Sequence, residues 1–162
     1  MGLDNFVRLA SDELFLKSLQ VTSFYVVLAV PLEVLTALTI ALILNTKGLP
    51  LMGIWRTLYY LPSIVSGVAV SILWLWIFSP QFGLLNYVLG LVGIPGPRWV
   101  YSEQWAIPAF VMMGAWHAGS NMLLYLAGLQ GIPTTLYEAA NIDGAGSLGR
   151  FFYVTLPMLS PT

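Results

Sequence analysis

Long stretches without a charged residue dominate the middle of this chain. The stretch from Thr57 to Pro97 contains no Asp, Glu, Lys or Arg, and a second one runs from Gln104 to Tyr137. Hydrophobic residues make up 58% of the chain and charged residues 8%, whereas a soluble domain carries roughly 25% charge. A water-soluble fold of this size could not bury so much apolar surface with so few charges outside. The sequence therefore predicts a membrane protein.

Three apolar stretches are long enough to cross a bilayer as helices, which takes about 20 residues each. They run from about 19 to 44, from about 58 to 78 and from about 105 to 129. The segment 84–92 is also apolar, but it is too short to span and turn residues flank it. We therefore expect an all-α fold of three transmembrane helices and one short interfacial helix.

The orientation in the membrane follows from the basic residues near the span ends. The connection 45–56 is short and contains Lys47 and Arg56 but no acid, which favours the cytoplasmic side. The N-terminus and the connection 79–104 then lie outside, and the segment after Leu129 lies in the cytoplasm. Each side carries three basic residues in total, so the charge density of the short connection decides this prediction.

The segment after the third span predicts a short surface helix over about 134–146. Thr135 fits an N-cap, and Glu138 three residues later would complete a capping box. Gly144 and Gly146 would end the helix. Ala139 and Ala140 leave a smooth face that suits docking into a groove of a partner. A surface helix without any partner fits the same residues equally well.

This segment resembles a known family. Glu138-Ala139-Ala140, three residues, Gly144, nine residues, Val154, one residue and Leu156-Pro157 resembles the EAA loop of ABC-importer permeases, with Val154 in place of the usual Ile. Other parts resemble the carbohydrate branch, the sugar permeases related to maltose- and lactose-type systems. These parts are Gly2-Leu3-Asp4-Asn5-Phe6, Arg56-Thr57-Leu58, Leu61-Pro62, Phe82-Gly83-Leu84-Leu85-Asn86, Gly128-Leu129-Gln130 and Ile142-Asp143. The resemblance covers essentially the whole chain.

The resemblance implies a sugar permease subunit that moves solute by alternating access. In such permeases the EAA loop is a coupling helix that docks on a separate ATP-binding subunit. The implied docking residues are Glu138, Ala139, Ala140, Asp143, Gly144, Leu156 and Pro157. ATP and Mg would be used by that ATPase, since this chain has no catalytic residue and no phosphate-loop sequence. The other implied partners are a second permease subunit, an extracytoplasmic solute-binding protein, a small-molecule sugar and the lipid bilayer.

The implied location is a bacterial-type inner membrane, which the chain would cross several times with the EAA loop in the cytoplasm. Family members usually have six spans in this core, so the chain is expected to be a fragment that lacks one span before Gly2 and two after Pro157. A truncated product that transports nothing is therefore an alternative. Another is a permease for a different solute, such as glycerol phosphate, although the spans contain no Lys or Arg to favour an anion.

The third span carries the candidate solute contacts. Positions 113, 116, 117 and 120 share a helical face. Aromatic and hydrogen-bonding side chains there suit a sugar, and the family places solute contacts partly on this span. The candidates are Met113, Trp116, His117, Ser120 and Asn121. The competing interpretation is helix packing, because Ala115 and Gly119 form a small-xxx-small pattern and Ser or Asn can hydrogen-bond across an interface.

The remaining charged residues leave several hypotheses open. Glu33 lies inside the first span, where an ionisable group either serves a functional site or hydrogen-bonds a neighbouring helix. An intramembrane enzyme that uses Glu33 and His117 is a distant rival. Arg150 is expected to pair with Asp143 or a lipid phosphate. The lone His and the lack of Cys argue against a metal site, and the net charge of -1 argues against nucleic-acid binding.

Overall fold

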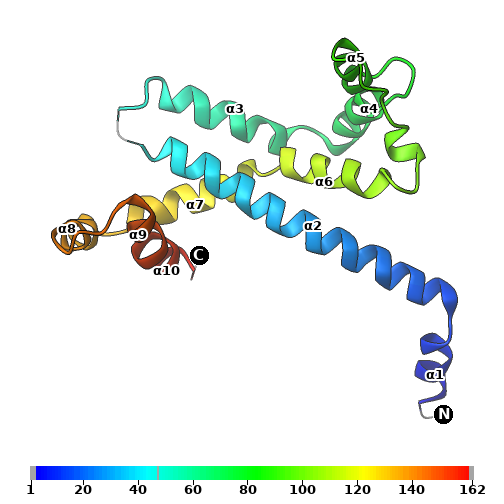
Figure 1. Ribbon diagram of the computed structural model, residues 1–162, viewed down its shortest axis with the longest axis horizontal. Coiled ribbons are helices and arrows are strands. Elements are labelled where there is room, and N and C mark those ends of the chain that lie inside the picture. Colours follow the sequence, from blue (N-terminus) through cyan, green and yellow to red (C-terminus); the bar gives the residue numbers. More distant parts are fainter. Residues whose placement is uncertain (1–2, 47, 161–162) are drawn as a thin grey trace. The chain divides into compact units, whose positions relative to one another are not determined.

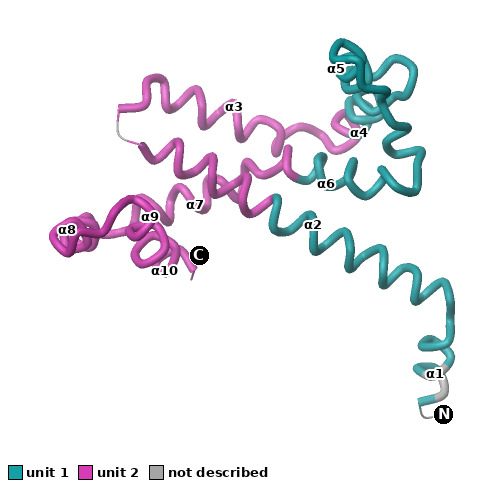
Figure 2. Tube along the Cα trace, viewed as in Figure 1, with its two compact units in different colours: residues 1–32, 71–114 teal, residues 33–70, 115–162 magenta. Residues whose placement is uncertain are grey.

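The computed structural model describes residues 3–46 and 48–160, and every regular element in these residues is a helix (Figure 1). Lys47, which contributes to the predicted orientation, and Gly2, part of the family resemblance, lie outside the described residues. The chain forms two compact units, which consist of residues 1–32 with 71–114 (unit 1) and residues 33–70 with 115–162 (unit 2) (Figure 2). Each unit is described by itself below.

The longest helix, α2, runs from Glu13 to Leu44 and contains the predicted span 19–44. It follows the short helix α1 (Asp4–Ala10), and the Asp12 carboxylate starts it by accepting hydrogen bonds from the backbone N–H groups of Leu14 and Phe15. At 1.5 Å per residue α2 is roughly 48 Å long, more than the hydrocarbon core of a bilayer. Among the described residues it is the one helix that is long and apolar enough to cross a membrane unaided.

The segment 58–78 is not one continuous helix, which corrects the sequence prediction on this point. It contains parts of α3 (Met52–Ile64) and α4 (Gly67–Ile77), separated at Val65, whose backbone is extended. Together these two helices pass the same test of length and hydropathy, but they are bent at the break. Ser66 and Gly67 follow Val65 directly, and both residue types favour a helix boundary over a helix interior.

The segment 105–129 is broken as well. Helix α6 runs from Ala106 to Trp116 and helix α7 from Gly119 to Gly131, with His117 and Ala118 in a turn between them. The expectation of one uninterrupted helix is therefore wrong. Positions 113, 116, 117 and 120 do not share the face of a single helix, so that part of the argument for a common solute surface no longer holds.

Unit 1 is built around an aromatic cluster. The ring of Phe78 stacks on Trp74 at 5.0 Å and lies 5.4 Å from Trp99, whose ring contacts Trp105 edge-on at 5.6 Å. Ala109 of α6 completes the buried core. The segment 84–92 forms the short helix α5 (Leu84–Leu91), and a 3-10 turn, η1 (Trp99–Tyr101), follows it.

Unit 2 is held together by small and aliphatic residues. Ala37, Ala41 and Leu44 of α2 share a buried cluster with residues of α7 and of the C-terminal segment, namely Ala118, Met122, Leu126, Leu129, Ile132 and Leu159. Small residues let helix backbones approach closely where the bilayer gives little hydrophobic driving force. The remaining elements are α8 (Thr134–Ile142), α9 (Ser147–Arg150), the π-helical turn η2 (Phe151–Thr155) and α10 (Leu156–Leu159).

Helices α3 and α7 contact each other in unit 2, and Gly119 makes that contact possible. A Cβ atom on Gly119 would collide with the carbonyl oxygen of Tyr59 and would lie 2.9 Å from the Ser63 hydroxyl. The same Ser63 hydroxyl donates a hydrogen bond of 3.4 Å to the carbonyl oxygen of His117, in the turn before α7. The predicted packing role of Gly119 is confirmed by this close approach.

Candidate functional site

The helix with the EAA residues, α8, starts differently from the sequence prediction. Pro133 occupies the N-cap position and no side chain caps the helix, so the capping box predicted for Thr135 and Glu138 is wrong. The ring of proline fixes its φ angle. Proline also has no backbone N–H that would need a hydrogen-bond acceptor. The helix therefore begins one residue earlier than Thr135, at Thr134, and the carboxylate of Glu138 is not used as a cap.

The end of α8 is a Schellman motif centred on Gly144. The N–H of Gly144 donates to the carbonyl of Asn141 at 3.1 Å, and the N–H of Ala145 donates to the carbonyl of Ala140 at 2.9 Å. Gly144 has a φ of +78°, which side-chain-bearing residues rarely adopt. The predicted role of Gly144 in ending the helix is therefore confirmed, and its cause is backbone conformation, because nothing lies within 4 Å of a Cβ built there.

Tyr137 anchors α8 to the rest of unit 2. Its hydroxyl is 3.0 Å from the Thr155 hydroxyl, and its ring packs against the buried cluster that contains Leu129 and Ile132. Thr155 is buried and also donates to the carbonyl of Arg150 at 3.3 Å. Sequence reasoning missed this anchor, although a Tyr directly before the EAA triplet and a Thr directly before Leu156-Pro157 were both visible.

The hydrogen bond between Tyr137 and Thr155 leaves most of the EAA residues of α8 exposed. Glu138, Ala139, Asp143 and Gly144 are exposed, while Ala140 is half-buried. Leu156 and Pro157 start α10, and they follow Thr155 directly, so the hydrogen bond between Tyr137 and Thr155 joins the two halves of the motif. The motif residues therefore form a small-residue surface on a helix that is fixed from its inner side by Tyr137 and at its end by the Schellman motif.

The candidate solute contacts are divided between the two units. Met113 belongs to unit 1, where it packs against the aromatic cluster, whereas Trp116, His117, Ser120 and Asn121 belong to unit 2. The rings of Trp116 and His117 meet edge-on at 5.3 Å, and the side chains of Trp116 and Ser120 are exposed. In unit 2, therefore, an aromatic ring, an imidazole and a hydroxyl occur around the break between α6 and α7.

Asn121 lies beside Glu33. The side-chain amide of Asn121 donates a 2.9 Å hydrogen bond to a carboxylate oxygen of Glu33, and both side chains are half-buried in unit 2. The hypothesis that Glu33 hydrogen-bonds a neighbouring helix is thereby confirmed. The bond joins α2 to α7 and leaves the second carboxylate oxygen of Glu33 as a further acceptor.

We expect the pair of Glu33 and Asn121 to contribute about 0.6 to 1.7 kcal/mol to stability, the range measured for hydrogen bonds between membrane helices. A double-mutant cycle with Glu33→Ala, Asn121→Ala and the double variant, followed by thermal unfolding in detergent, measures this coupling directly. Effects of the single substitutions that simply add would show that the two side chains do not interact.

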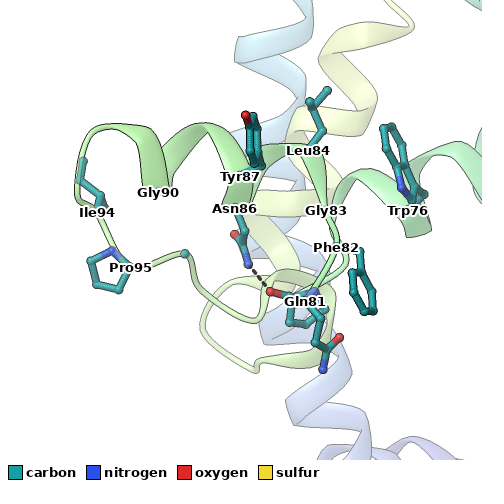
Figure 3. A pocket seen from close by; sticks show the side chains of 12 residues that line it. Trp76, Gln81, Phe82, Gly83, Leu84, Asn86, Tyr87, Gly90, Ile94 and Pro95 are labelled. Atoms are coloured by element: carbon teal, nitrogen blue, oxygen red, sulfur yellow. Dashed lines mark hydrogen bonds between the residues drawn. The ribbon is translucent and has the colours of Figure 1, made fainter.

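A pocket in unit 1 lies beside α5 (Figure 3). It has a volume of about 660 Å³ and is lined by Trp76, Phe82, Tyr87, the amides of Gln81 and Asn86, and residues of the Ile94-Pro95-Gly96 turn. Asn86 fixes its wall: the amide donates to the carbonyls of Pro80 (3.1 Å) and Pro97 (3.2 Å), and its oxygen accepts a 2.7 Å bond from the Trp99 indole. The connections before and after α5 are thereby held to this helix.

We expect Asn86→Ala to destabilise unit 1 by about 2 kcal/mol, because it leaves the indole N–H of the buried Trp99 without its acceptor. Tryptophan fluorescence during thermal unfolding measures the change. Gln81→Ala is the matched control, since Gln81 lines the same pocket with an exposed side chain. Equal melting temperatures for the two variants would contradict the structural role of Asn86.

Within the described residues no group of three or more His, Asp or Glu side chains lies close enough together to hold a metal ion. The motif residues of α8 combine small side chains with two carboxylates. Ala139 and Ala140 present little side chain, and Glu138 and Asp143 add negative charge at either end of them.

The chain is similar to curated transport proteins. It is 45% identical to the probable ABC transporter permease protein YesP of Bacillus subtilis, over 99% of this chain and 52% of that protein. It is 41% identical to the lactose transport system permease protein LacF of Rhizobium radiobacter, over 99% of this chain and 54% of that protein. The chain thus spans about half the length of the curated relatives it matches.

A solved structure agrees with these relatives. The chain matches the crystal structure of a bacterial ABC transporter involved in the import of the acidic polysaccharide alginate with a TM-score of 0.81 and 29% identity, over 99% of this chain and 57% of that one. The family described as binding-protein-dependent transport system inner membrane component matches residues 33–162, most of the chain. The chain therefore belongs to this family of ABC-importer permeases, and its relatives include sugar permeases.

Proposed function

We propose that this chain forms part of the membrane-spanning permease of an ATP-driven sugar importer. On this proposal α8 is the coupling helix, and a separate ATP-binding subunit, which uses ATP and Mg, receives it in a groove. A second permease subunit and an extracytoplasmic solute-binding protein complete the assembly. The single observation that carries the proposal is the construction of α8, which is anchored by Tyr137 and ended by Gly144 while its small-residue surface stays exposed.

This construction suits a part that transmits movement. A helix that swings freely on a linker could not pull on the membrane segments, whereas α8 is connected through Tyr137 to Thr155 and to the cluster that contains α2 and α7. The exposed surface of Glu138 and Ala139 has no role in that connection. A partner that binds this surface therefore gains a rigid attachment to the helices of unit 2.

The proposal includes three membrane crossings, of which the second and third are broken helices. The first is 19–44 within α2; the second, 58–78, lies within α3 and α4; the third, 105–129, lies within α6 and α7. Broken helices are tolerated at membrane depth only where protein or a water-filled path satisfies the freed backbone groups. Interrupted spans of this kind fit a solute pathway, and the proposed multi-pass chain has its EAA loop in the cytoplasm.

The proposed solute contacts are Trp116, His117, Ser120 and Asn121 of unit 2, which surround one of these breaks. A ring face and several hydrogen-bonding groups are what a sugar needs. The three predicted spans contain no Lys or Arg, which favours a neutral sugar. An acidic saccharide is the second candidate, because the transporter of similar structure imports alginate. Uptake of a neutral disaccharide and of a uronic-acid oligosaccharide by cells with the complete transporter separates the two.

The docking proposal is tested by co-purification of the ATP-binding subunit from the same transport system. We expect the unaltered chain to retain this subunit in detergent and Ala139→Trp to lose it at least about tenfold, because the indole would fill the docking surface. Leu148→Trp is the matched control: Leu148 is exposed and lies outside α8. Retention by both variants would place docking elsewhere and overturn the proposal.

A further inference from the structure

A second pocket lies beside α8, the proposed coupling helix, and all of its lining residues belong to unit 2. It has a volume of about 430 Å³. Its walls come from the end of α2, from α7 and α8, and from α9 with η2, and the lining residues are Leu42, Asn45, Thr46, Leu129, Tyr137, Ser147, Arg150, Phe151 and Thr155. Four of these carry hydroxyl groups and one is an amide, but Arg150 is the single charged residue among them.

Arg150 enters this pocket with its positive charge unneutralised by its hydrogen-bond partners. One guanidinium nitrogen donates to the side-chain oxygen of Asn141 at 2.8 Å, and the other donates to the Ser147 hydroxyl at 3.3 Å. Both partners are uncharged, so the expectation that Arg150 pairs with Asp143 is not met by these bonds. A guanidinium has five N–H donors, so about three remain for a ligand.

The position of the pocket along α2 identifies the kind of ligand. Helix α2 ends in the apolar run 40–44, and the polar residues Asn45 and Thr46 follow it directly. The lining of the pocket likewise includes both apolar residues, Leu42 and Phe151, and polar residues, Asn45 and Thr46. A lipid changes from acyl chain to headgroup over the same distance, and basic pockets at the cytoplasmic ends of membrane helices bind anionic headgroups.

We propose that this pocket binds the phosphate group of an anionic phospholipid of the cytoplasmic leaflet, with Arg150 as the residue that holds it. The proposal rests on the proposed function only for the orientation, which puts the end of α2 at the cytoplasmic face. Arginine suits phosphate because its planar donors contact two oxygens at once. The hydroxyl of Ser147, which accepts from Arg150, keeps its own proton to donate to the same phosphate.

The consequence reaches the coupling helix through Asn141. Asn141 lies in the last turn of α8, and its carbonyl accepts the Gly144 hydrogen bond of the Schellman motif. Because the guanidinium has donors to spare, a phosphate does not displace Asn141. The bound phosphate instead restrains Arg150 in the orientation that holds Asn141. An anionic lipid therefore orders the end of the helix that carries the docking surface.

The test measures binding of fluorescent phosphatidylglycerol and phosphatidylcholine to the full chain in neutral detergent. We expect phosphatidylglycerol to bind about fivefold more tightly, the factor that one surface charge contributes. Arg150→Gln should lose this preference, and Arg150→Lys should keep only part of it. Arg98→Gln, which removes an exposed charge from unit 1, is the matched control and should behave as the unaltered chain.

A preference that survives in Arg150→Gln would overturn the proposal. If that variant does not fold, a photoreactive phosphatidylglycerol on the unaltered chain decides: cross-links in the segment 145–155 support the pocket, and cross-links confined to other segments refute it. Displacement of the lipid by millimolar inorganic phosphate would assign the pocket to a soluble anion and refute the lipid. None of these readouts needs the ATP-binding subunit, so failure of the docking proposal is recognised separately.

Discussion

Gly144→Val is expected to reduce the binding of the ATP-binding subunit at least about tenfold. The residue has a φ of +78°, and an L-residue in this left-handed conformation costs roughly 1–2 kcal/mol, with a β-branched side chain at the unfavourable end. Valine would therefore open the Schellman motif and let the last turn of α8 unwind, which displaces Ala140 and Asp143 from the docking surface. Co-purification of the ATP-binding subunit in detergent measures the loss.

Gly144→Asn is the control that separates backbone conformation from space. Asparagine adopts the left-handed conformation far more readily than other side-chain-bearing residues, so this variant should retain the subunit. Loss in both variants would mean that the partner itself occupies the space beside Gly144, since among the described residues no atom beyond those of Gly144 and its chain neighbours lies within 4 Å of a Cβ there. Retention in both would show that the Schellman motif is not needed for docking.

Gly119→Val is expected to lower the stability of the protein by about 3 kcal/mol, the upper part of the range for overpacking a core. The new side chain would collide with the Tyr59 carbonyl, which is backbone and cannot turn aside, and with the Ser63 hydroxyl. Helices α3 and α7 would have to separate, and the hydrogen bond from Ser63 to the His117 carbonyl would lengthen. The melting temperature in detergent is the measurement.

Gly131→Val is the matched control because Gly131 ends the same helix and a Cβ atom added to it would have nothing within 4 Å. It should change the melting temperature little, and Gly119→Ala should fall between the two valine variants. If Gly119→Val and Gly131→Val melted alike, helix propensity rather than the α3–α7 contact would explain the effect.

The sequence predicted the helical class and the end of α8 at Gly144 well because both depend on local signals. Apolar runs are read directly from hydropathy. Glycine, the residue at position 144, is one of the few residue types that tolerate a positive φ. The cap of α8 was predicted wrongly because Thr135 and Glu138 fit a capping box, while Pro133 just before them already set the backbone for helix entry. The capping-box pattern and the restricted backbone of Pro133 favoured different N-caps, and Pro133 is the one observed.

The breaks in the helices and the contacts between them could not be predicted in the same way. Hydropathy sums over a window and is insensitive to one extended residue such as Val65. The partner of Glu33 is Asn121, far away in the chain, and only the packing of α2 on α7 brings them together. The hydrogen bond between Tyr137 and Thr155 likewise depends on how η2 folds back, which no local pattern encodes.

The hydrogen bond from Ser63 to His117 also constrains how the protein can move. Ser63 lies just before the interruption after α3, and His117 lies in the interruption before α7. A carbonyl released by a helix break is costly in a lipid environment unless another group satisfies it. The Ser63 hydroxyl, close to one interruption, donates to a carbonyl in the other, so a movement of α3 away from α7 would break this hydrogen bond. We expect the two interruptions to move together, because this hydrogen bond connects them.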